Sequence, residues 1–279
     1  MYRIVKKETL NPSVNLYEIE APMTAKTAQP GQFVILRSHK DGERIPITIH
    51  DCDREKGTVT IIVQTVGAAT ERLRHMEQGE FLEDFVGPLG RPTEIEGNKK
   101  VCVIGGGVGC AIAYPVLKKF HDCGAEVHAI AGFRNRDMVI LEEKFRSVSD
   151  LFRLCTDDGS YGEKGLVTDA LRDLLGKGHF YDQVIAIGPL VMMKFVALTT
   201  EEYGIPTTVS MNPIMVDGTG MCGGCRLTVG GETKFACVDG PDFDGHLVDW
   251  DESLKRSRMY ADWERHKHSQ TCNLFRKEA

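Results

Sequence analysis

The sequence has no excess of basic residues, no pattern of a secretion signal and no unbroken apolar run of membrane-spanning length. Its 34 Lys and Arg are outnumbered by 40 Asp and Glu, for a net charge of -6, whereas a nucleic-acid-binding surface needs a clustered basic face. The N-terminal stretch "MYRIVKKETLNPS" is polar, and the longest uncharged run, from Val101 to Leu117, is interrupted by glycines and Pro115. We therefore expect a cytoplasmic protein that binds neither nucleic acid nor a membrane.

Cysteine occurs nine times, an odd number, and no secretion signal accompanies it. A disulfide framework is therefore not expected, and metal ligands together with buried free thiols fit a reducing compartment. Six cysteines lack metal-ligand spacing and are expected to be small buried hydrophobes, except that the last is an exposed thiol in the tail. These six are Cys52, Cys102, Cys110, Cys123, Cys155 and Cys272.

The texture of the sequence changes along the chain. Residues 1–98 contain short, alternating, β-branched apolar runs separated by turn residues, which predicts a small antiparallel barrel. Residues 99–210 alternate apolar strands such as "VCVIGG" with helical stretches such as "VTDALRDLLGKG", which predicts a parallel α/β domain. Residues 211–245 hold a Cys-x-x-Cys motif, and residues 246–279 form a charged, aromatic tail. The expected fold class is a β barrel plus α/β.

The stretch "DGTGMCGGC" and the later "KFACVDG" carry the three remaining cysteines, Cys222, Cys225 and Cys237. A plant-type [2Fe-2S] site spaces its thiolates Cys-x4-Cys-x2-Cys with a fourth much later, and counting back from Cys222 places Asp217 at the first position. Carboxylate is an acceptable anionic ligand for ferric iron. We therefore predict a [2Fe-2S] site held by Asp217 and the three cysteines. A structural zinc site or a cluster of buried thiols remains an alternative.

The segment "VCVIGGGVG" is an apolar strand that runs into a glycine-rich turn and then a helix. Glycines at such a turn allow close approach of a diphosphate, and the helix N-terminus favours its charge. Cys110 stands where the strict Gly-x-Gly-x-x-Gly pattern needs glycine, and Glu126 opens the next strand instead of ending it. A conventional Rossmann dehydrogenase domain is therefore disfavoured, and a tight turn without a ligand stays an alternative.

Two segments before this turn, "ERIPITI" and "QTVGAATERL", resemble motifs of the ferredoxin reductase family of flavoproteins. In that family a flavin-binding barrel precedes a nicotinamide-binding α/β domain. The resemblance implies that Arg44 contacts the FAD pyrophosphate and that Thr48 lies near the flavin N5, which makes Thr48 the candidate catalytic residue. Ile47 stands where the family usually has an aromatic residue. The other flavin contacts that the resemblance implies are Pro46, Ile47, Gly67, Ala68, Ala69 and Thr70.

Three later segments resemble the nicotinamide-binding half of the same family. "IGPLVMM" resembles its Cys-Gly-Pro-x-x-Met loop, with Ile187 in place of the cysteine, and "CTDDGSYGEKG" resembles its Asp-Gly-Ser segment. Arg134 and Arg136 in "GFRNR" fall near the adenosine end and could equally serve a 2′-phosphate, so the choice between NAD and NADP stays open. The implied NAD(H) contacts are Gly105, Gly106, Gly107, Val108, Gly109, Arg134, Asp158, Gly159, Gly188, Pro189 and Met192.

Taken together, these motifs resemble the electron-transfer subunits of dihydroorotate dehydrogenase. The aspartate at the first cluster position and the long tail are closer to the small subunits of NADH-dependent reduced ferredoxin:NADP+ oxidoreductases, also described as sulfide dehydrogenase subunits. The resemblance implies hydride exchange between NAD(H) and FAD. It also implies single-electron relay through the [2Fe-2S] cluster to a larger subunit with another FAD and [4Fe-4S] clusters, and through that subunit to ferredoxin. The tail would then dock on this partner. A redox sensor or a zinc-stabilised binding module on the same fold is the non-enzymatic alternative.

Overall fold

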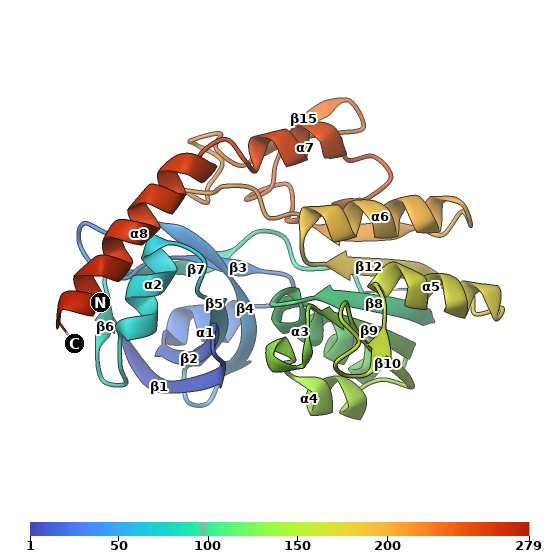
Figure 1. Cartoon of the computed structure of the whole chain (residues 1–279), viewed down its shortest axis with the longest axis horizontal. Coiled ribbons are helices and arrows are strands. Elements are labelled where there is room, and N and C mark those ends of the chain that lie inside the picture. Colours follow the sequence, from blue (N-terminus) through green and yellow to red (C-terminus); the bar gives the residue numbers. More distant parts are fainter. Residues whose placement is uncertain (96, 98, 279) are drawn as a thin grey trace.

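The computed structural model describes residues 1–95, 97 and 99–278, with side chains as far as Thr271. Its two main sheets follow one another along the chain, as Figure 1 shows in blue to cyan and in green to orange. The predicted antiparallel barrel followed by a parallel α/β unit is confirmed. The predicted boundary falls at residue 98, which lies outside the described residues, and the division of the chain into four domains remains a proposal.

The first sheet is antiparallel throughout, in the strand order β6-β1-β2-β5-β4-β3-β7, and curls into a nearly closed barrel. Alternate side chains such as Tyr17, Ile19 and Ile61 point into its core, as the period of two in the sequence requires. Its strands are β1 (Tyr2–Asn11), β2 (Val14–Glu20), β3 (Phe33–Arg37), β4 (Ile45–Asp53), β5 (Thr58–Gln64), β6 (Phe81–Leu82) and β7 (Asp84–Leu89), with helices α1 (Pro22–Thr27) and α2 (Ala68–His75).

The second sheet has the order β11-β10-β9-β8-β12-β13-β16 and is parallel except for its last strand. Its central strands are apolar on both faces because helices cover both: in β8, Cys102 and Ile104 join one core cluster, whereas Val101 and Val103 join the other. The elements are β8 (Lys100–Gly106), α3 (Gly109–Asp122), β9 (Glu126–Phe133), η1 (Arg136–Met138), α4 (Glu142–Ser147), β10 (Leu151–Thr156), β11 (Glu163–Lys164), α5 (Val167–Gly176), β12 (Gln183–Ile187), α6 (Leu190–Glu201) and β13 (Thr207–Ser210).

The C-terminal part joins both halves of the molecule. The strand β16 (Asp242–Asp244) pairs antiparallel with β13, so the second sheet takes a strand from beyond residue 210. The hairpin of β14 (Arg226–Val229) and β15 (Glu232–Phe235) is followed by α7 (Trp250–Arg256) and α8 (Ala261–Glu278). Helix α8 then packs against α2 on the barrel (Figure 1), where His268 lies 3.5 Å from the Glu71 carboxylate. Within the described residues, no helix is both long and apolar enough to cross a bilayer.

The six cysteines without ligand spacing are mostly buried, as predicted. Cys102, Cys110 and Cys155 lie in the cores, and Cys52 is half-buried. The prediction is wrong for Cys123, which is exposed because it caps the C-terminus of α3, where the chain turns through Gly124 in a left-handed conformation. The side chain of Cys272 lies outside the described residues.

Gly109 lets α3 begin in direct contact with the end of β12. A Cβ atom there would lie 2.4 Å from the carbonyl oxygen of Ile187, and backbone cannot yield as a flexible side chain can. We expect Gly109→Ala to lower the free energy of unfolding by about 1–3 kcal/mol, as for other overpacked sites, measured by urea denaturation. Gly176→Ala is the matched control: it ends α5 with nothing within 4 Å of the added methyl and should stabilise by up to about 1 kcal/mol. Equal urea midpoints for the two variants would contradict this account.

Candidate functional site

The glycine turn and the Gly-Pro-x-x-Met turn lie against each other at the carboxyl edge of the parallel sheet. A Cβ atom on Gly106 would lie 2.3 Å from the Met192 sulfur, and one on Gly188 would lie 2.9 Å from the same methionine's methyl group. Gly107 takes a left-handed conformation with φ of 56°, and its N–H donates to the Gly132 carbonyl at 2.8 Å. Close packing of the two turns thus accounts for part of the glycine content, and ligands of parallel sheets bind at this edge.

The predicted adenosine end is formed by the segments that follow β9 and β10. The Asp158 N–H donates to the Arg134 carbonyl at 3.4 Å, so these two predicted contacts are neighbours. Arg136 is engaged differently: its N–H donates to the Ser160 hydroxyl and its guanidinium lies 5.5 Å from the Tyr161 ring centre. Between the two arginines, the Asn135 Oδ1 atom is buried and has no hydrogen-bond partner among the described residues. An unpaired buried acceptor of this kind fits a donor supplied by a bound nucleotide.

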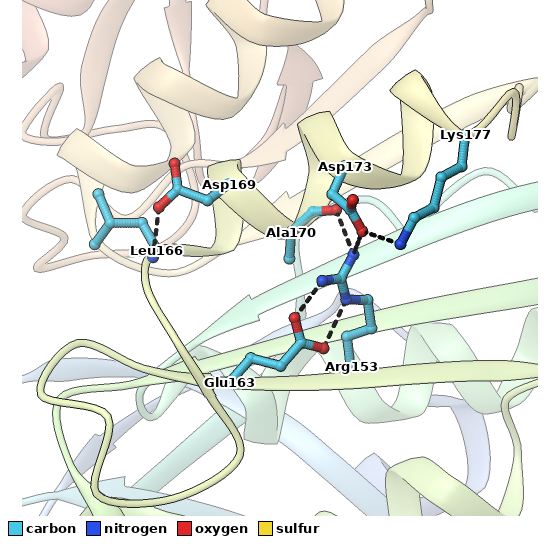
Figure 2. Close-up of polar contacts among 7 residues, drawn as sticks. All are labelled: Arg153, Glu163, Leu166, Asp169, Ala170, Asp173 and Lys177. Atoms are coloured by element: carbon cyan, nitrogen blue, oxygen red, sulfur yellow. Dashed lines mark hydrogen bonds and ion pairs between the residues drawn. The ribbon is translucent and has the colours of Figure 1, made fainter.

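An ion-pair network holds the far end of the Asp-Gly-Ser segment. Figure 2 shows Arg153 of β10 between Glu163 of β11 and Asp173 of α5. The Arg153 Nε donates to Glu163 at 2.7 Å, and Lys177 adds a second cation 2.7 Å from Asp173. The hydrogen bond from Arg153 holds the pKa of the Glu163 carboxyl below its usual value. The loop between Thr156 and Glu163 is therefore anchored at both ends.

The predicted flavin motif lies at the start of β4, next to β3. Thr48 stands opposite Phe33, and Ile47 stands opposite Val34, in the antiparallel register. The Arg44 Nε donates to the Val216 carbonyl at 2.8 Å, and its Nη1 lies 3.3 Å from the Asp84 carboxylate. Arg44 therefore connects the barrel with the loop that carries Asp217.

The second predicted flavin segment forms the N-terminus of α2. The Thr70 hydroxyl accepts from the N–H groups of Val66 and Gly67 at 2.9 and 3.0 Å, and donates to the Gly67 carbonyl. Nothing lies within 4 Å of a Cβ atom built on Gly67, so the turn faces open space. Ala68 and Ala69 begin the helix there, and the first N–H groups of a helix have no partner within it. The segment is able to receive an anionic group.

The four predicted cluster ligands lie in two layers. The Cys225 and Cys237 side chains are buried, with their sulfur atoms 3.2 Å apart, whereas Cys222 is exposed and Asp217 is half-buried. The Asp217 carboxylate accepts from the Thr219 N–H and hydroxyl and from the Met221 N–H. Among the described residues, no three His, Cys, Asp or Glu side chains come close enough together to hold a metal ion. The ligand set therefore remains a prediction.

The electrostatics of this loop suit anionic ligands. The Gly224 N–H, and after it the Asp217 N–H, hold the pKa of the Cys222 thiol below its usual value. Backbone and hydroxyl donors of Thr219 do the same for the pKa of the Asp217 carboxyl. Burial raises the pKa of the Cys237 thiol to about 12, so that thiol must lose its proton when a metal binds. Backbone N–H groups aimed at a sulfur are what an iron–sulfur site needs, and the donor set fits such a group.

Two arginines near this loop were not expected from the sequence. The Arg91 Nε donates to the Val238 carbonyl and the Arg256 Nη2 donates to the Gly224 carbonyl, both at 3.1 Å. Arg91 belongs to the linker after the barrel and Arg256 to the charged tail. Neither has a spacing relation to the cysteines, so no local signal in the sequence could have identified them.

Known proteins resemble the chain over nearly its full length. Residues 212–249 match the family model of the iron-sulfur cluster binding domain of dihydroorotate dehydrogenase B. A Thermotoga maritima protein described as "dihydroorotate dehydrogenase B (NAD(+)), electron transfer subunit homolog" is 48% identical over 262 residues, which cover 94% of this chain and 92% of the relative. The chain belongs to the dihydroorotate dehydrogenase B electron-transfer subunit family.

One further relative and a solved structure are also similar to the chain over nearly its full length. The "uncharacterized protein in adh 3'region" of Clostridium beijerinckii is 54% identical, over 93% of this chain and 90% of that protein. A structure described for flavin-based electron bifurcation by the NADH-dependent reduced ferredoxin-NADP oxidoreductase is 45% identical and superposes with a TM-score of 0.92, covering 97% of each chain. This protein is therefore an electron-transfer subunit of a flavin and iron–sulfur oxidoreductase family. Its fold and its iron–sulfur domain support an iron–sulfur cluster together with flavin and NAD binding, and subunits of this family imply a larger catalytic partner.

Proposed function

We propose that the chain exchanges hydride between NAD(H) and FAD and relays single electrons through a [2Fe-2S] cluster. The acceptor is a larger subunit with its own FAD and [4Fe-4S] clusters, within a ferredoxin-linked NADH/NADP+ transhydrogenase. When bound, a flavin supplies the conversion between two-electron and one-electron chemistry, and a cluster supplies one-electron transfer. The chain's own residues bind and orient these groups.

The contact between Arg44 and Val216 carries the proposal. It joins the predicted flavin motif on β4 to the residue just before the predicted ligand Asp217, at a distance of 2.8 Å. A flavin held by Arg44 and Thr48 would therefore lie close to a cluster held by Asp217, Cys222, Cys225 and Cys237. Such proximity is what electron relay between the two groups requires.

The division of labour among the other residues follows from their positions. The N-terminus of α2, with Gly67, would receive the FAD pyrophosphate, because its first N–H groups point outward. The paired turns of Gly106 and Gly188 would receive the nicotinamide half of NAD(H) at the carboxyl edge of the sheet. Asn135 and Arg134 would meet the adenosine end. The proposal needs no proton-transferring side chain.

The surroundings of the exposed ligand Cys222 suit docking of the larger subunit. Several apolar side chains near it are exposed, most of all Met221 with 87% of its surface, and exposed apolar clusters mark interaction sites. Ile214 and Val216, which precede it in the chain, and Val238, which follows Cys237, are exposed as well. In the tail, Met259, Tyr260 and Trp263 are exposed as well, so the tail both packs on α2 and retains an apolar surface for a partner.

Cofactor analysis and flavin reduction test the proposal. Anaerobically purified protein should contain FAD, together with iron and acid-labile sulfide in equal amounts. NADH should bleach the flavin absorbance faster than NADPH does in stopped-flow measurements. The NADH preference is expected because the Arg136 guanidinium stacks on Tyr161, which leaves only Arg134 to face a 2′-phosphate. Protein that contains zinc and no iron would favour the binding-module alternative. Faster reduction of the flavin by NADPH than by NADH would identify NADP(H) as the preferred nucleotide.

A second candidate function is electron transfer to a dihydroorotate-oxidising subunit. The match of residues 212–249 to the dihydroorotate dehydrogenase B cluster domain favours it. The carboxylate at position 217, in place of a thiolate, favours the transhydrogenase. Co-purification of the tagged chain from its own cells distinguishes the two, because only the transhydrogenase partner brings additional iron–sulfur clusters.

A further inference from the structure

Three arginines from separate parts of the chain converge on the segments that carry the predicted cluster ligands. Arg44 immediately precedes β4, Arg91 lies in the linker between the two sheets, and Arg256 ends α7. Each guanidinium donates a hydrogen bond to a backbone carbonyl, at 2.8, 3.1 and 3.1 Å respectively. The three acceptors belong to Val216, Val238 and Gly224.

Each of these carbonyls belongs to the immediate neighbour of a predicted ligand. Val216 precedes Asp217, Gly224 precedes Cys225, and Val238 follows Cys237. Three arginines from separate segments of the chain therefore all bind carbonyls that adjoin predicted ligands. The contacts fix the backbone beside three of the four predicted ligands while leaving the ligand side chains free.

The peptide group bound by Arg44 is shared with a predicted ligand. The carbonyl of Val216 and the N–H of Asp217 belong to one planar, trans peptide, so they point in opposite directions. Arg44 binds the carbonyl side at 2.8 Å, and the N–H of the predicted ligand Asp217 lies on the other side. A cation at the carbonyl polarises the peptide and makes its N–H a stronger hydrogen-bond donor.

We propose that the three cations Arg44, Arg91 and Arg256 raise the reduction potential of the predicted cluster. A cluster gains one negative charge on reduction, and nearby positive charges and hydrogen bonds to its sulfurs stabilise that state. The inference rests on the proposed function, because it takes the cluster site as given. It adds residues whose role is positioning and tuning rather than ligation.

The three arginines should contribute unequally. Arg256 is half-buried, so solvent screens its charge less than it screens the charge of Arg91. Arg91 is 70% exposed and also lies 3.9 Å from the Asp239 carboxylate, which offsets its charge. Arg44 shares the Asp84 carboxylate with Arg37. We therefore expect removal of the Arg256 charge to lower the reduction potential most, and removal of the Arg91 charge to lower it less.

The test is a spectroelectrochemical titration of the cluster in the full-length, FAD-loaded chain, with iron and sulfide measured on the same samples. Arg256→Gln should lower the equilibrium constant for cluster reduction about tenfold, which is about 59 mV for a one-electron couple. Arg91→Gln should lower this equilibrium constant severalfold. The variant with both substitutions should lower it by roughly the product of the two single fold-changes. Arg256→Lys retains the charge and should stay near wild type. Arg258→Gln removes an exposed charge two residues away on the same chain segment and should leave the potential unchanged.

Three outcomes would overturn the inference. Equal shifts for Arg256→Gln and Arg258→Gln would mean that only net charge matters. Loss of iron with an unchanged potential in the remaining clusters would mean that the arginines only hold the loops. A wild-type chain without iron and sulfide would remove the proposed function itself, whereas a normal cluster that ignores the arginines would remove this inference alone.

Discussion

Asp217→Ala is expected to lose most of its iron and sulfide, whereas Asp217→Cys should keep a full complement with a shifted potential. Asp217 stands five positions before Cys222, where the plant-type pattern has a cysteine. A thiolate there restores the ordinary ligand set but changes the covalency and charge at one iron. The shift should be on the order of 59 mV, a tenfold change in the reduction equilibrium. Iron and sulfide assays and a redox titration measure both effects.

The structure makes a control necessary, because Asp217 also organises its own loop. Its carboxylate accepts hydrogen bonds from Thr219 and Met221, so an alanine removes a turn as well as a ligand. Asp217→Asn retains an acceptor oxygen for the turn but is neutral and a poorer ligand. If the carboxylate binds iron, Asp217→Asn should lose the cluster nearly as Asp217→Ala does. An asparagine variant with wild-type iron content and potential would exclude Asp217 as a ligand.

Arg44→Ala is expected to weaken FAD binding by roughly ten- to a hundredfold while the fold persists. A hydrogen bond to a charged group contributes about 1.5–3 kcal/mol, and each 1.4 kcal/mol is about a tenfold change in affinity. The Arg44 side chain lies at the surface with 30% of its area exposed, so its removal should not unfold the barrel. Fluorescence titration of the flavin-free protein with FAD gives the dissociation constant.

Arg37→Ala is the matched control for this variant. Arg37 also binds the Asp84 carboxylate, at 2.7 Å, but lies on β3 outside the predicted flavin motif. It should retain FAD if the pyrophosphate is bound by Arg44 itself. Equal loss of FAD in the two variants would show that both act through Asp84. Iron content should be followed in parallel, because Arg44 also holds the Val216 carbonyl.

The fold was predictable because its signals are local. In β2 and β5, apolar and polar side chains alternate because one face of each strand packs on the barrel core. In β8 nearly all side chains are apolar because both faces of the strand are buried. The cluster loop was recognisable for a similar reason, since its cysteine spacing is set by one short segment of backbone. The glycine turn was recognised, but not that Gly106 and Gly188 both pack against Met192.

The features that sequence reasoning missed all depend on residues far apart in the chain. Arg91 and Arg256 contact the segments of the predicted cluster ligands only through the tertiary structure, and the sequence around either arginine is that of an ordinary solvated cation. The pairing of β16 with β13 is likewise decided by tertiary contacts, because a three-residue strand has no periodicity of its own. Such contacts are decided by the tertiary structure, and the spacing of residues along the sequence does not reveal them.

The packing of α8 on α2 has a consequence for how the protein is made. All strands of the barrel lie before residue 90, whereas α8 begins at Ala261. At the usual elongation rate of roughly 5–20 residues per second, the nascent barrel waits on the order of ten seconds or more before α8 emerges. During that interval the surface of α2 around Glu71 is not yet covered by α8. A helix that follows both sheets in the chain therefore completes the surface of the barrel that precedes them.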